Sequence, residues 1–235
     1  MQPVIELIDL CKHYQIADQT IHALRGIQLT ILPQEFVTIV GQSGSGKSTL
    51  MNILGCLDVP TSGKYLLRGQ DTGALNDHQL SIIRNREIGF IFQGFNLIPS
   101  LDALENVELP LIYRGIRERE RKILCTNALI RVGLQHRIHH RPNEMSGGQQ
   151  QRVAIARAIA ASPSLILADE PTGNLDRNST REILTLLHEL HDAGSTIVLI
   201  THDESIASAA LRCIRVEDGK IVSDNRKIRN QCAAG

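Results

Sequence analysis

The sequence predicts an α/β fold with a mainly parallel sheet, and three observations favour this class. Short, continuously apolar runs such as Leu165–Ala168 and Ile197–Ile200 are typical of strands buried on both faces. Segments with apolar residues at helical spacing lie between such runs, as in chains that alternate strands and helices. Both runs end abruptly in polar residues, at the position where an open α/β sheet binds its ligands. The chain is therefore expected to form one large domain around a site at a sheet edge.

Length and composition limit the classes of protein to which this chain can belong. With 235 residues, of which 42% are hydrophobic, it can bury a full core, which argues against disorder. Its 25 Lys and Arg residues balance 25 Asp and Glu residues, so charge gives no reason to expect nucleic acid or an anionic membrane surface as a partner. No apolar run approaches the ~18 residues of a membrane span, and the N-terminus lacks a secretory signal. The five cysteines lack metal-binding spacing, and we expect reduced thiols in a cytosolic chain.

The N-terminal part predicts a small antiparallel β lobe that leads into the main sheet. Val4–Leu10 and Ile27–Ile31 have the composition of short strands, and Pro33–Glu35 predicts a turn before the strand Phe36–Val40. We place Tyr14 in the loop after the first strand. There it is either a half-buried loop residue or an aromatic surface on which an adenine ring stacks.

A glycine-rich loop follows the strand that ends at Val40 and opens a helix near Lys47. The glycines allow the backbone N–H groups to approach a polyphosphate, and the start of the helix directs its positive dipole end at the same anion. Lys47 adds a positive charge for the β and γ phosphates, and Ser48 stands where the pattern G-x-x-x-x-G-K-[ST] places a Mg²⁺ ligand. The predicted cradle consists of Gly41, Gln42, Ser43, Gly44, Ser45, Gly46, Lys47, Ser48 and Thr49.

The middle of the chain changes from mixed to helical sequence. A helix over Leu50–Leu54 ends at Gly55, and the apolar strand Ile88–Phe92 ends on the polar Gln93. From Leu101 to Arg141 the sequence is charged and helical, without strand signals, which predicts an inserted α-helical lobe. We place this helical subdomain at residues 94–145, and the β lobe plus core at residues 1–93 and 146–235.

The segment Met145–Gln149 opens a helix whose predicted apolar stripe contains Val153, Ala156, Ile159 and Ala160. Ser146, followed by two glycines, is either an ordinary N-cap or part of a small anion site, because both use the free N–H groups of a helix start. The residues alone leave both interpretations open.

Two carboxylates, Asp169 and Glu170, end the buried strand at Leu165–Ala168. Next to bound polyphosphate, Asp169 can hold Mg²⁺ through water and Glu170 can polarise the attacking water. The next strand ends at His202, which we expect on the same sheet edge as Gly41 and Asp169.

The helix between these two strands and the end of the chain complete the expected elements. Ser179–Glu182 predicts a capping box for a helix that ends at Gly194, and Glu217–Lys220 predicts a final hairpin turn. The expected buried face of the helix consists of Ile183, Leu186, Leu187 and Leu190.

Taken in order, these motifs resemble the ATP-binding subunit of ABC transporters, over nearly the whole chain. The resemblance implies a P-loop NTPase (RecA-like) core. The segments Met51–Asp58 and Ala168–Asp176 resemble the MacB/LolD-like branch of the family. Met145 is a departure, since leucine is usual there. The matching motifs are the P-loop Gly41–Thr49, the Q-loop residue Gln93, the signature Met145–Gln149, the Walker B run ending at Asp169 and Glu170, the D-loop Asn174–Asp176 and the switch histidine His202.

The resemblance also implies a mechanism. Two copies form a head-to-tail dimer in which ATP bound at Lys47 of one copy, together with Mg²⁺, is also contacted by the signature of the other. Glu170 acts as base and His202 contacts the γ-phosphate. Tyr14 stacks on the adenine, while Ser48, Gln93 and Asp169 serve the metal. The implied contacts from the second copy are Ser146, Gly147 and Gly148, and Asp176 of the D-loop is a further residue of the implied nucleotide site.

A membrane permease is the implied partner, docking near Phe95–Leu101, so the chain is expected in the cytoplasm at the inner face of the membrane. The permease of the MacB/LolD branch carries out export, efflux or lipoprotein extraction. Regulation of a periplasmic enzyme, as in cell-division ATPases of this family, is the alternative function. The polar sequence from Ser223 onward favours a separate subunit over the N-terminal portion of a fused transporter.

Overall fold

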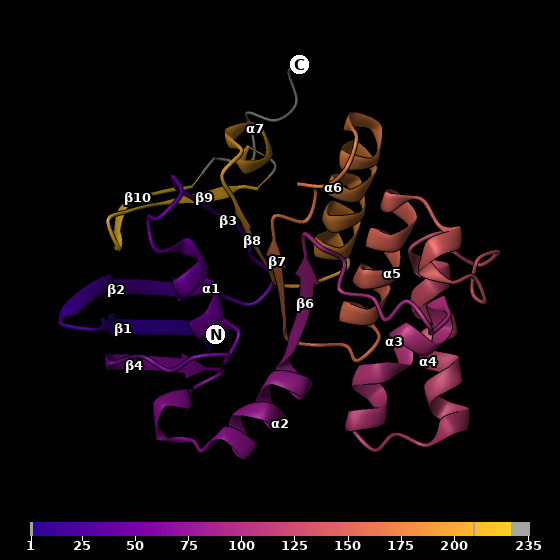
Figure 1. Cartoon of the computed structure of the whole chain (residues 1–235), viewed down its shortest axis with the longest axis horizontal. Helices are drawn as coiled ribbons and strands as arrows, with labels where there is room; N and C mark the ends of the chain where they lie inside the picture. Colours follow the sequence, from indigo (N-terminus) through magenta and orange to yellow (C-terminus); the bar gives the residue numbers. More distant parts are fainter. Residues whose placement is uncertain (1, 209, 227–235) are drawn as a thin grey trace. The chain divides into compact units, whose positions relative to one another are not determined.

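The computed structural model describes residues 2–208 and 210–226, which form two compact units. The first takes its described residues from Met1–Ser81 and Ser195–Gly235, and the second is Ile82–Gly194 (Figure 1). Within the described residues, no helix has both the length and the apolar character needed to cross a bilayer. Cys11, Cys56, Cys125 and Cys213 carry free thiols, and Cys232 lies outside the described residues.

The first unit contains the predicted antiparallel lobe as a four-stranded sheet in the order β2-β1-β4-β5. Its strands are β1 (Ile5–Ile16), β2 (Gln19–Ile31), β4 (Ser62–Leu67) and β5 (Gln70–Asp71), followed by a 3-10 helix (Thr72–Ala74).

The β1–β2 hairpin is longer than the sequence predicted, and the placement of Tyr14 in a loop is wrong. Tyr14 lies within β1 and pairs with Ile21 of β2. The connection is only Ala17 and Asp18, with Ala17 in the left-handed region at φ 50°. The first four residues of β2 are exposed, so the outer hairpin lacks the buried, alternating residues by which a strand is recognised in sequence.

The same unit also contains parallel strands that carry the glycine-rich loop. β3 (Phe36–Val40) lies between β8 (Ile197–Thr201) and β9 (Arg212–Glu217), parallel to both, and β10 (Lys220–Arg226) pairs antiparallel with β9. All residues of β3 and β8 are buried, which confirms the expectation for the apolar run Ile197–Ile200.

Two short helices flank these strands. α1 (Lys47–Leu54) ends at the predicted C-cap Gly55, and α7 (Glu204–Ala207) follows β8. The predicted final turn is confirmed at Asp218 and Gly219, both with positive φ.

A buried arginine joins the end of this sheet to the turn before β3. The Arg212 guanidinium is 2.7 Å from Glu35 Oε2 and 2.7 Å from Asp224 Oδ2, and it donates to the carbonyl of Thr30 at 2.8 Å. A buried charge is tolerable only when it is paired in this way. The contacts therefore fix β9 and β10 against the entry to the loop strand.

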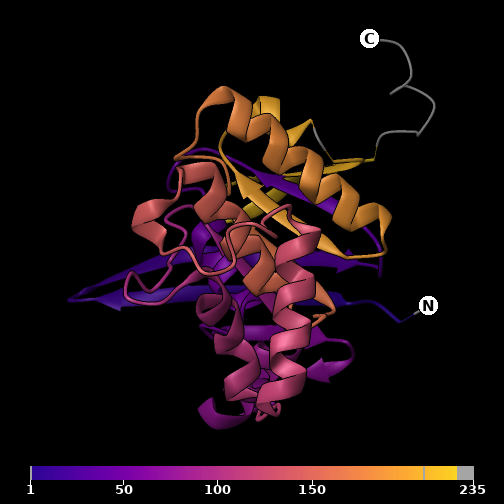
Figure 2. The same cartoon turned by 90° about the vertical axis from the view of Figure 1, so that its right-hand side faces the viewer.

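The second unit is built on the parallel pair β6 (Ile88–Phe92) and β7 (Leu165–Asp169). α2 (Asp77–Glu87) leads into β6. Figure 1 and Figure 2 show the helices that belong to this unit, of which α5 packs against β6, α3, α4 and α6. The helices are α3 (Ala103–Tyr113), α4 (Glu118–Arg131), α5 (Gly147–Ile159) and α6 (Arg177–Asp192), with a 3-10 helix (Pro142–Glu144) before α5.

The predicted helical insertion is present as α3 and α4, and the predicted stripe of α5 is buried. α2 was not predicted because Leu80 is its only buried residue, which leaves no apolar stripe in the sequence. With an antiparallel lobe, parallel strands and inserted helices, the predicted fold class is confirmed.

The predicted capping box at Ser179 is wrong, because α6 begins at Arg177 with Asp176 as its N-cap. Asp176 Oδ1 accepts from the N–H groups of Asn178 and Ser179 at 2.9 and 3.0 Å. Ser179 belongs to the first turn, and its hydroxyl donates to Asp176 Oδ2 at 2.7 Å. The predicted buried face is confirmed at Ile183, Leu186, Leu187 and Leu190.

Candidate functional site

The glycine-rich loop connects β3 to α1 in the first unit and packs tightly against the backbone around it. Gly46 is the N-cap of α1 in the left-handed region, at φ 103°. A Cβ built on Gly46 would lie 2.6 Å from the carbonyl oxygen of Ala23, so a larger residue cannot fit without a backbone shift. The loop therefore adopts the close backbone turn on which the phosphate-cradle prediction depends.

Lys47 is buried at the start of α1, and its ammonium turns back over the loop. Nζ donates to the carbonyl oxygens of Gly41 and Gln42, both at 2.7 Å. These contacts satisfy a charge that would otherwise be costly to bury. They also place the cation against the loop, where phosphate oxygens can take over from the carbonyls.

Ser45 gives a separate indication that the loop fits an anion. Its side chain is buried, and within the described residues its Oγ has no hydrogen-bond partner. Buried hydroxyls normally find a partner, and a phosphate oxygen would satisfy this one. Ser43 and Gly44 on the loop and Ser48 in the first turn of α1 are exposed, so the ligand side of the cradle is accessible.

Histidine 202 follows β8 at the edge that carries the loop. Val40 pairs with Thr201, so Gly41 and His202 leave neighbouring parallel strands at the same end. The expected neighbourhood of Gly41 and His202 is thus confirmed. Asp169, expected on that same edge, belongs to the second unit.

Tyr14 is half-buried on β1, also in the first unit. Its hydroxyl donates to Asp58 Oδ2 at 2.8 Å, and the Lys12 ammonium lies 4.9 Å from the centre of its ring. Burial raises the pKa of the Tyr14 phenol, and the hydrogen bond to Asp58 raises it further. The ring is therefore a fixed, neutral aromatic surface, and its contacts with Asp58 and Lys12 were not identified in the sequence.

In the second unit, the carboxyl ends of β6 and β7 bring together Gln93 and Glu170. Phe92 pairs with Asp169, so the residues that follow them lie side by side at one edge. Glu170 has φ 45°, a left-handed conformation that is uncommon for a residue other than glycine. Strained conformations of this kind are concentrated at functional sites.

Two amides connect the segment after β6 with the segment after β7. Gln93 Nε2 donates to Asn174 Oδ1 at 3.2 Å, and Asn174 Nδ2 donates to the Gln93 carbonyl oxygen at 3.1 Å. The predicted Q-loop and D-loop are therefore in direct contact within this unit.

The helix start at Ser146 has the geometry of a capping box. Gln149 N–H donates to Ser146 Oγ at 3.3 Å, and Ser146 N–H donates to Gln149 Oε1 at 3.1 Å. The N-cap interpretation is confirmed, while the anion-site interpretation stays a prediction. A Cβ on Gly148 would lie 2.9 Å from Ser179 Oγ, so glycine lets the starts of α5 and α6 come close.

Arg157 on α5 holds the segment after Gln93, and sequence reasoning missed it. Its Nη1 donates to the carbonyl of Asn96 at 2.5 Å and its Nη2 to the carbonyl of Phe95 at 2.8 Å. Phe95 and Asn96 are both left-handed, at φ 58° and 50°. A half-buried arginine on a helix gives no local signal of such a distant contact.

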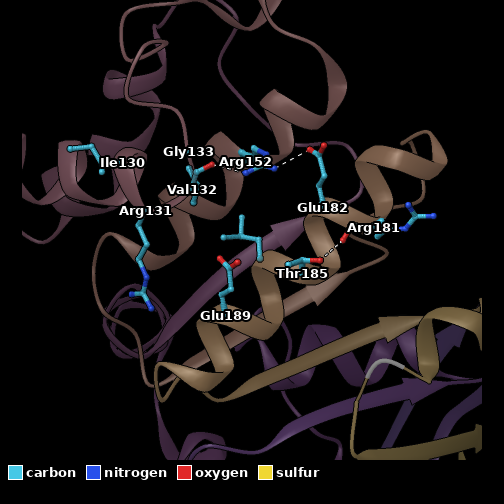
Figure 3. Close-up of a pocket in the computed structure, with 10 residues that line it drawn as sticks. Ile130, Arg131, Val132, Gly133, Arg152, Arg181, Glu182, Thr185 and Glu189 are labelled. Carbon is cyan, nitrogen blue, oxygen red and sulfur yellow. Dashed lines mark hydrogen bonds and ion pairs between the residues drawn. The ribbon is translucent and has the colours of Figure 1, made fainter. Parts of the chain in front are cut away.

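A surface cavity of about 400 Å³ lies beside α4, α5 and α6 in the second unit (Figure 3). Arg152 donates there to the Val132 carbonyl at 2.8 Å and to Glu182 Oε2 at 2.9 Å. The described residues that line this cavity include none of the predicted site residues. The cavity is therefore distinct from both halves of the predicted site.

Comparison with known proteins gives concordant matches. A sequence model of the ABC transporter family matches residues 24–173. The chain is 52% identical over 223 residues to the macrolide export ATP-binding/permease protein MacB of Hyphomonas neptunium, covering 95% of this chain and 35% of that protein. It is 51% identical over 227 residues to an ABC transporter ATP-binding protein of Thermotoga maritima, covering 97% of each.

Solved structures agree with the sequence matches. The dimeric structure of MJ0796, a bacterial ABC transporter cassette, gives a TM-score of 0.86 at 45% identity and covers 94% of this chain and 98% of that one. The same cassette in a post-hydrolysis state bound to ADP and Pi gives a TM-score of 0.86 at 44% identity. The chain thus spans about a third of the MacB protein, at 35% of its length, and nearly all of the cassette.

Proposed function

We propose that this chain, which belongs to the ABC transporter family, binds ATP at its glycine-rich loop and couples ATP hydrolysis to movement of a membrane permease. It has the P-loop NTPase fold of an ABC ATPase cassette, homologous to MacB/LolD-type nucleotide-binding domains, and it is an ATPase. The observation that carries the site assignment is the loop itself. It combines the buried Lys47 ammonium on loop carbonyls with the unpartnered Ser45 hydroxyl.

The loop residues bind the phosphates of ATP. Lys47 exchanges its carbonyl partners for β and γ phosphate oxygens, and the Ser45 hydroxyl donates to a phosphate. The N–H groups at the start of α1 add further donors, because the first N–H groups of a helix lack partners within it. The remaining contacts of the cradle are Gly41, Ser43, Gly44, Gly46, Ser48 and Thr49, and Tyr14 stacks on the base.

Ser48, Gln93 and Asp169 are the metal ligands of this proposal. Their hydroxyl, amide and carboxylate oxygens are the hard donors that suit Mg²⁺, and Ser48 is exposed in the first turn of α1. When bound, Mg²⁺ neutralises charge on the phosphate oxygens. Glu170 accepts a proton from the attacking water, and the His202 imidazole contacts the γ-phosphate.

The active form is a head-to-tail homodimer. The N-capped start of α5 places Ser146, Gly147 and Gly148 at a helix N-terminus, which suits contact with the phosphates bound by the second copy. Asp176 contacts the second copy from the adjoining start of α6. MJ0796 is described as dimeric, which supports this assembly.

A membrane permease, either a separate subunit or part of the same polypeptide, is the partner of this dimer, and export, efflux or lipoprotein extraction is its class of activity. MacB of H. neptunium is named as an ATP-binding/permease protein, which supports a permease partner. The permease docks near Phe95–Leu101 of a helical subdomain at residues 94–145, the remainder being the β lobe and core. The chain is accordingly at the inner face of the cell membrane, in the cytoplasm.

Glu170→Gln tests the enzymatic proposal. The amide retains the shape of the side chain and cannot accept the proton, so turnover should fall by about 10²–10⁴-fold while ATP still binds. Size-exclusion chromatography with ATP should then show an accumulated dimer. A variant that hydrolyses ATP at the wild-type rate would exclude Glu170 as the base.

Isolation of the membrane partner separates transport from signalling. Native purification from membranes should recover a permease whose loss abolishes efflux, export or extraction. A partner that instead controls a periplasmic hydrolase, with no effect on cargo movement, would contradict the transport proposal.

A further inference from the structure

Two charged residues surround Tyr14 and connect it to the end of α1. Lys12 and Tyr14 are two positions apart on β1, and therefore project from the same face of the strand. Lys12 is buried, with Nζ 2.6 Å from Asp58 Oδ1 and 2.9 Å from the carbonyl oxygen of Val59. A buried ammonium needs such partners to offset the loss of water.

Asp58 divides its two carboxylate oxygens between Lys12 and Tyr14. Oδ1 accepts from the Lys12 ammonium, and Oδ2 accepts from the Tyr14 hydroxyl at 2.8 Å. Burial opposes ionisation of Asp58, yet the hydrogen bonds from Lys12 and Tyr14 lower its pKa overall. The carboxylate is therefore charged at neutral pH and holds both partners at once.

The same arrangement fixes the orientation of the Tyr14 ring. The hydroxyl is held by Asp58, and the Lys12 ammonium lies 4.9 Å from the ring centre, within the range of a cation–π contact. A phenol anchored at its hydroxyl and at one face has little rotational freedom left. A flat ligand can then stack on the opposite face without the entropy loss of ordering the ring on binding.

Asp58 is in turn anchored to the helix that begins at the phosphate loop. The N–H groups of Leu57 and Asp58 both donate to the carbonyl oxygen of Asn52 on α1, at 2.8 and 3.2 Å. The chain of contacts runs from the Tyr14 ring through Asp58 to α1, whose first residue is Lys47. The separation between the aromatic surface and the phosphate cradle is thereby fixed by direct hydrogen bonds.

We infer that Lys12 and Asp58 are positioning residues that hold Tyr14 at a set distance from the phosphate loop, so that base and phosphates of one nucleotide are recognised together. This inference rests on the proposed function, in which Tyr14 stacks on the base. A purely architectural role, joining β1 to α1, is the competing explanation. The two differ because positioning matters only for ligands that carry a base.

Calorimetric binding of ATP and of inorganic tripolyphosphate, each with Mg²⁺, to the full chain separates these explanations. Tyr14→Ala should weaken ATP binding about 5- to 100-fold, the range expected for loss of base–aromatic stacking. Asp58→Asn should weaken ATP binding about fivefold, as expected for one net hydrogen bond, and leave tripolyphosphate binding unchanged. Lys12→Met should act in the same direction, and Lys12→Arg should restore part of the loss because it keeps a cation near the ring.

The decisive comparison is the double variant. Because Asp58 acts through Tyr14, adding Asp58→Asn to Tyr14→Ala should cause no further loss of ATP affinity. Asp77→Asn, an exposed acidic residue in the first turn of α2, is the matched control and should change neither ligand. Should Asp58→Asn fail to fold, Tyr14→Phe removes the same hydrogen bond while keeping the ring, and should show the same selective loss for ATP.

Three outcomes decide the matter. Equal weakening of ATP and tripolyphosphate by Asp58→Asn, or by Tyr14→Phe where it replaces that variant, overturns the positioning role. So does a further loss of ATP affinity when Asp58→Asn is added to Tyr14→Ala. Absence of ATP binding by the wild-type chain instead refutes the proposed function, which keeps the two failures distinct.

Discussion

Replacement of Arg157 by alanine tests whether α5 controls the segment that follows Gln93. In the wild-type chain one guanidinium donates to the consecutive carbonyls of Phe95 and Asn96, at 2.8 and 2.5 Å. Alanine removes both bonds and keeps the helix, because alanine is the best helix former.

The size of the effect follows from two opposing contributions. Each hydrogen bond from a charged donor contributes about 1.5–3 kcal/mol. The left-handed residues Phe95 and Asn96 cost about 1–2 kcal/mol each, with Asn at the low end, and this cost is recovered once the segment is released. The loss of unfolding free energy should therefore be only about 1–3 kcal/mol, accompanied by a large local loss of order.

Urea unfolding and amide hydrogen exchange measure the two parts separately. Arg157→Ala should lower the unfolding midpoint modestly and increase exchange at residues 94–97 by much more than elsewhere. Arg157→Lys should also increase exchange there, because an ammonium lacks the planar fork that reaches both carbonyls. Arg152→Ala on the same helix is the control, since its partners are Val132 and Glu182. Unchanged exchange at residues 94–97 in Arg157→Ala would refute the reasoning.

Three further predictions concern the dimer, the loop and the pH dependence of stability. Ser146→Arg and Lys47→Ala should each abolish ATPase activity when tested alone. Mixing the two variants should restore part of the activity, because the mixed dimer has one composite site with both residues intact. No recovery of turnover in the mixture would contradict a site shared between two copies. Gly46→Ala should lower the unfolding free energy in urea by about 1–3 kcal/mol, because Gly46 has a positive φ and the added Cβ would lie 2.6 Å from the Ala23 carbonyl oxygen. Gly115→Ala should lower it less, because Gly115 also has a positive φ but its Cβ would enter open space. The hydrogen bond from Arg212 lowers the pKa of Asp224 in the folded chain. The stabilisation that this ion pair provides is therefore complete above the unfolded-state pKa near 4 and is lost as pH falls through the lower folded-state pKa. In Asp224→Asn the unfolding free energy should fall less steeply with decreasing pH below about pH 4, and the same slope in both proteins would count against this ion pair.

The strands of the core could be predicted closely because their evidence is local. β3, β6, β7 and β8 are short apolar runs, and each begins and ends within one residue of the range expected from the sequence. Since parallel strands end at a common edge, His202 could also be placed beside Gly41. The structure agrees, since Val40 pairs with Thr201; the pairing of Phe92 with Asp169 was not predicted.

The elements that were missed or displaced lack such local evidence. The outer β1–β2 hairpin is exposed, and α2 buries only Leu80, so neither has an apolar pattern to recognise. The start of α6 lies in a segment with several residues that favour N-caps, namely Asp176, Asn178, Ser179 and Thr180. In the structure Asp176 caps the helix and accepts from the N–H groups of Asn178 and Ser179, but the sequence offers no means of ranking these candidates.

The residues that support the site are harder still to find. Lys12 and Asp58 are 46 positions apart, and Arg157 and Asn96 are 61 apart. Motifs reveal residues that contact a ligand, because the chemistry restricts their types. Residues that act through another side chain meet only a geometric requirement, which becomes visible once the fold brings them together.

The amide pair formed by Gln93 and Asn174 should break too readily to slow the ATPase cycle. Both side chains are exposed and uncharged, so their separation leaves no unpaired charge, and water can hydrogen-bond to both amides immediately. Because each hydrogen bond contributes a net free energy of only about 1 kcal/mol, the pair should break and re-form on the nanosecond to microsecond timescale of loop motions. Such a contact keeps its strength over a wide range of ionic strength, unlike an ion pair, and is too short-lived to limit turnover.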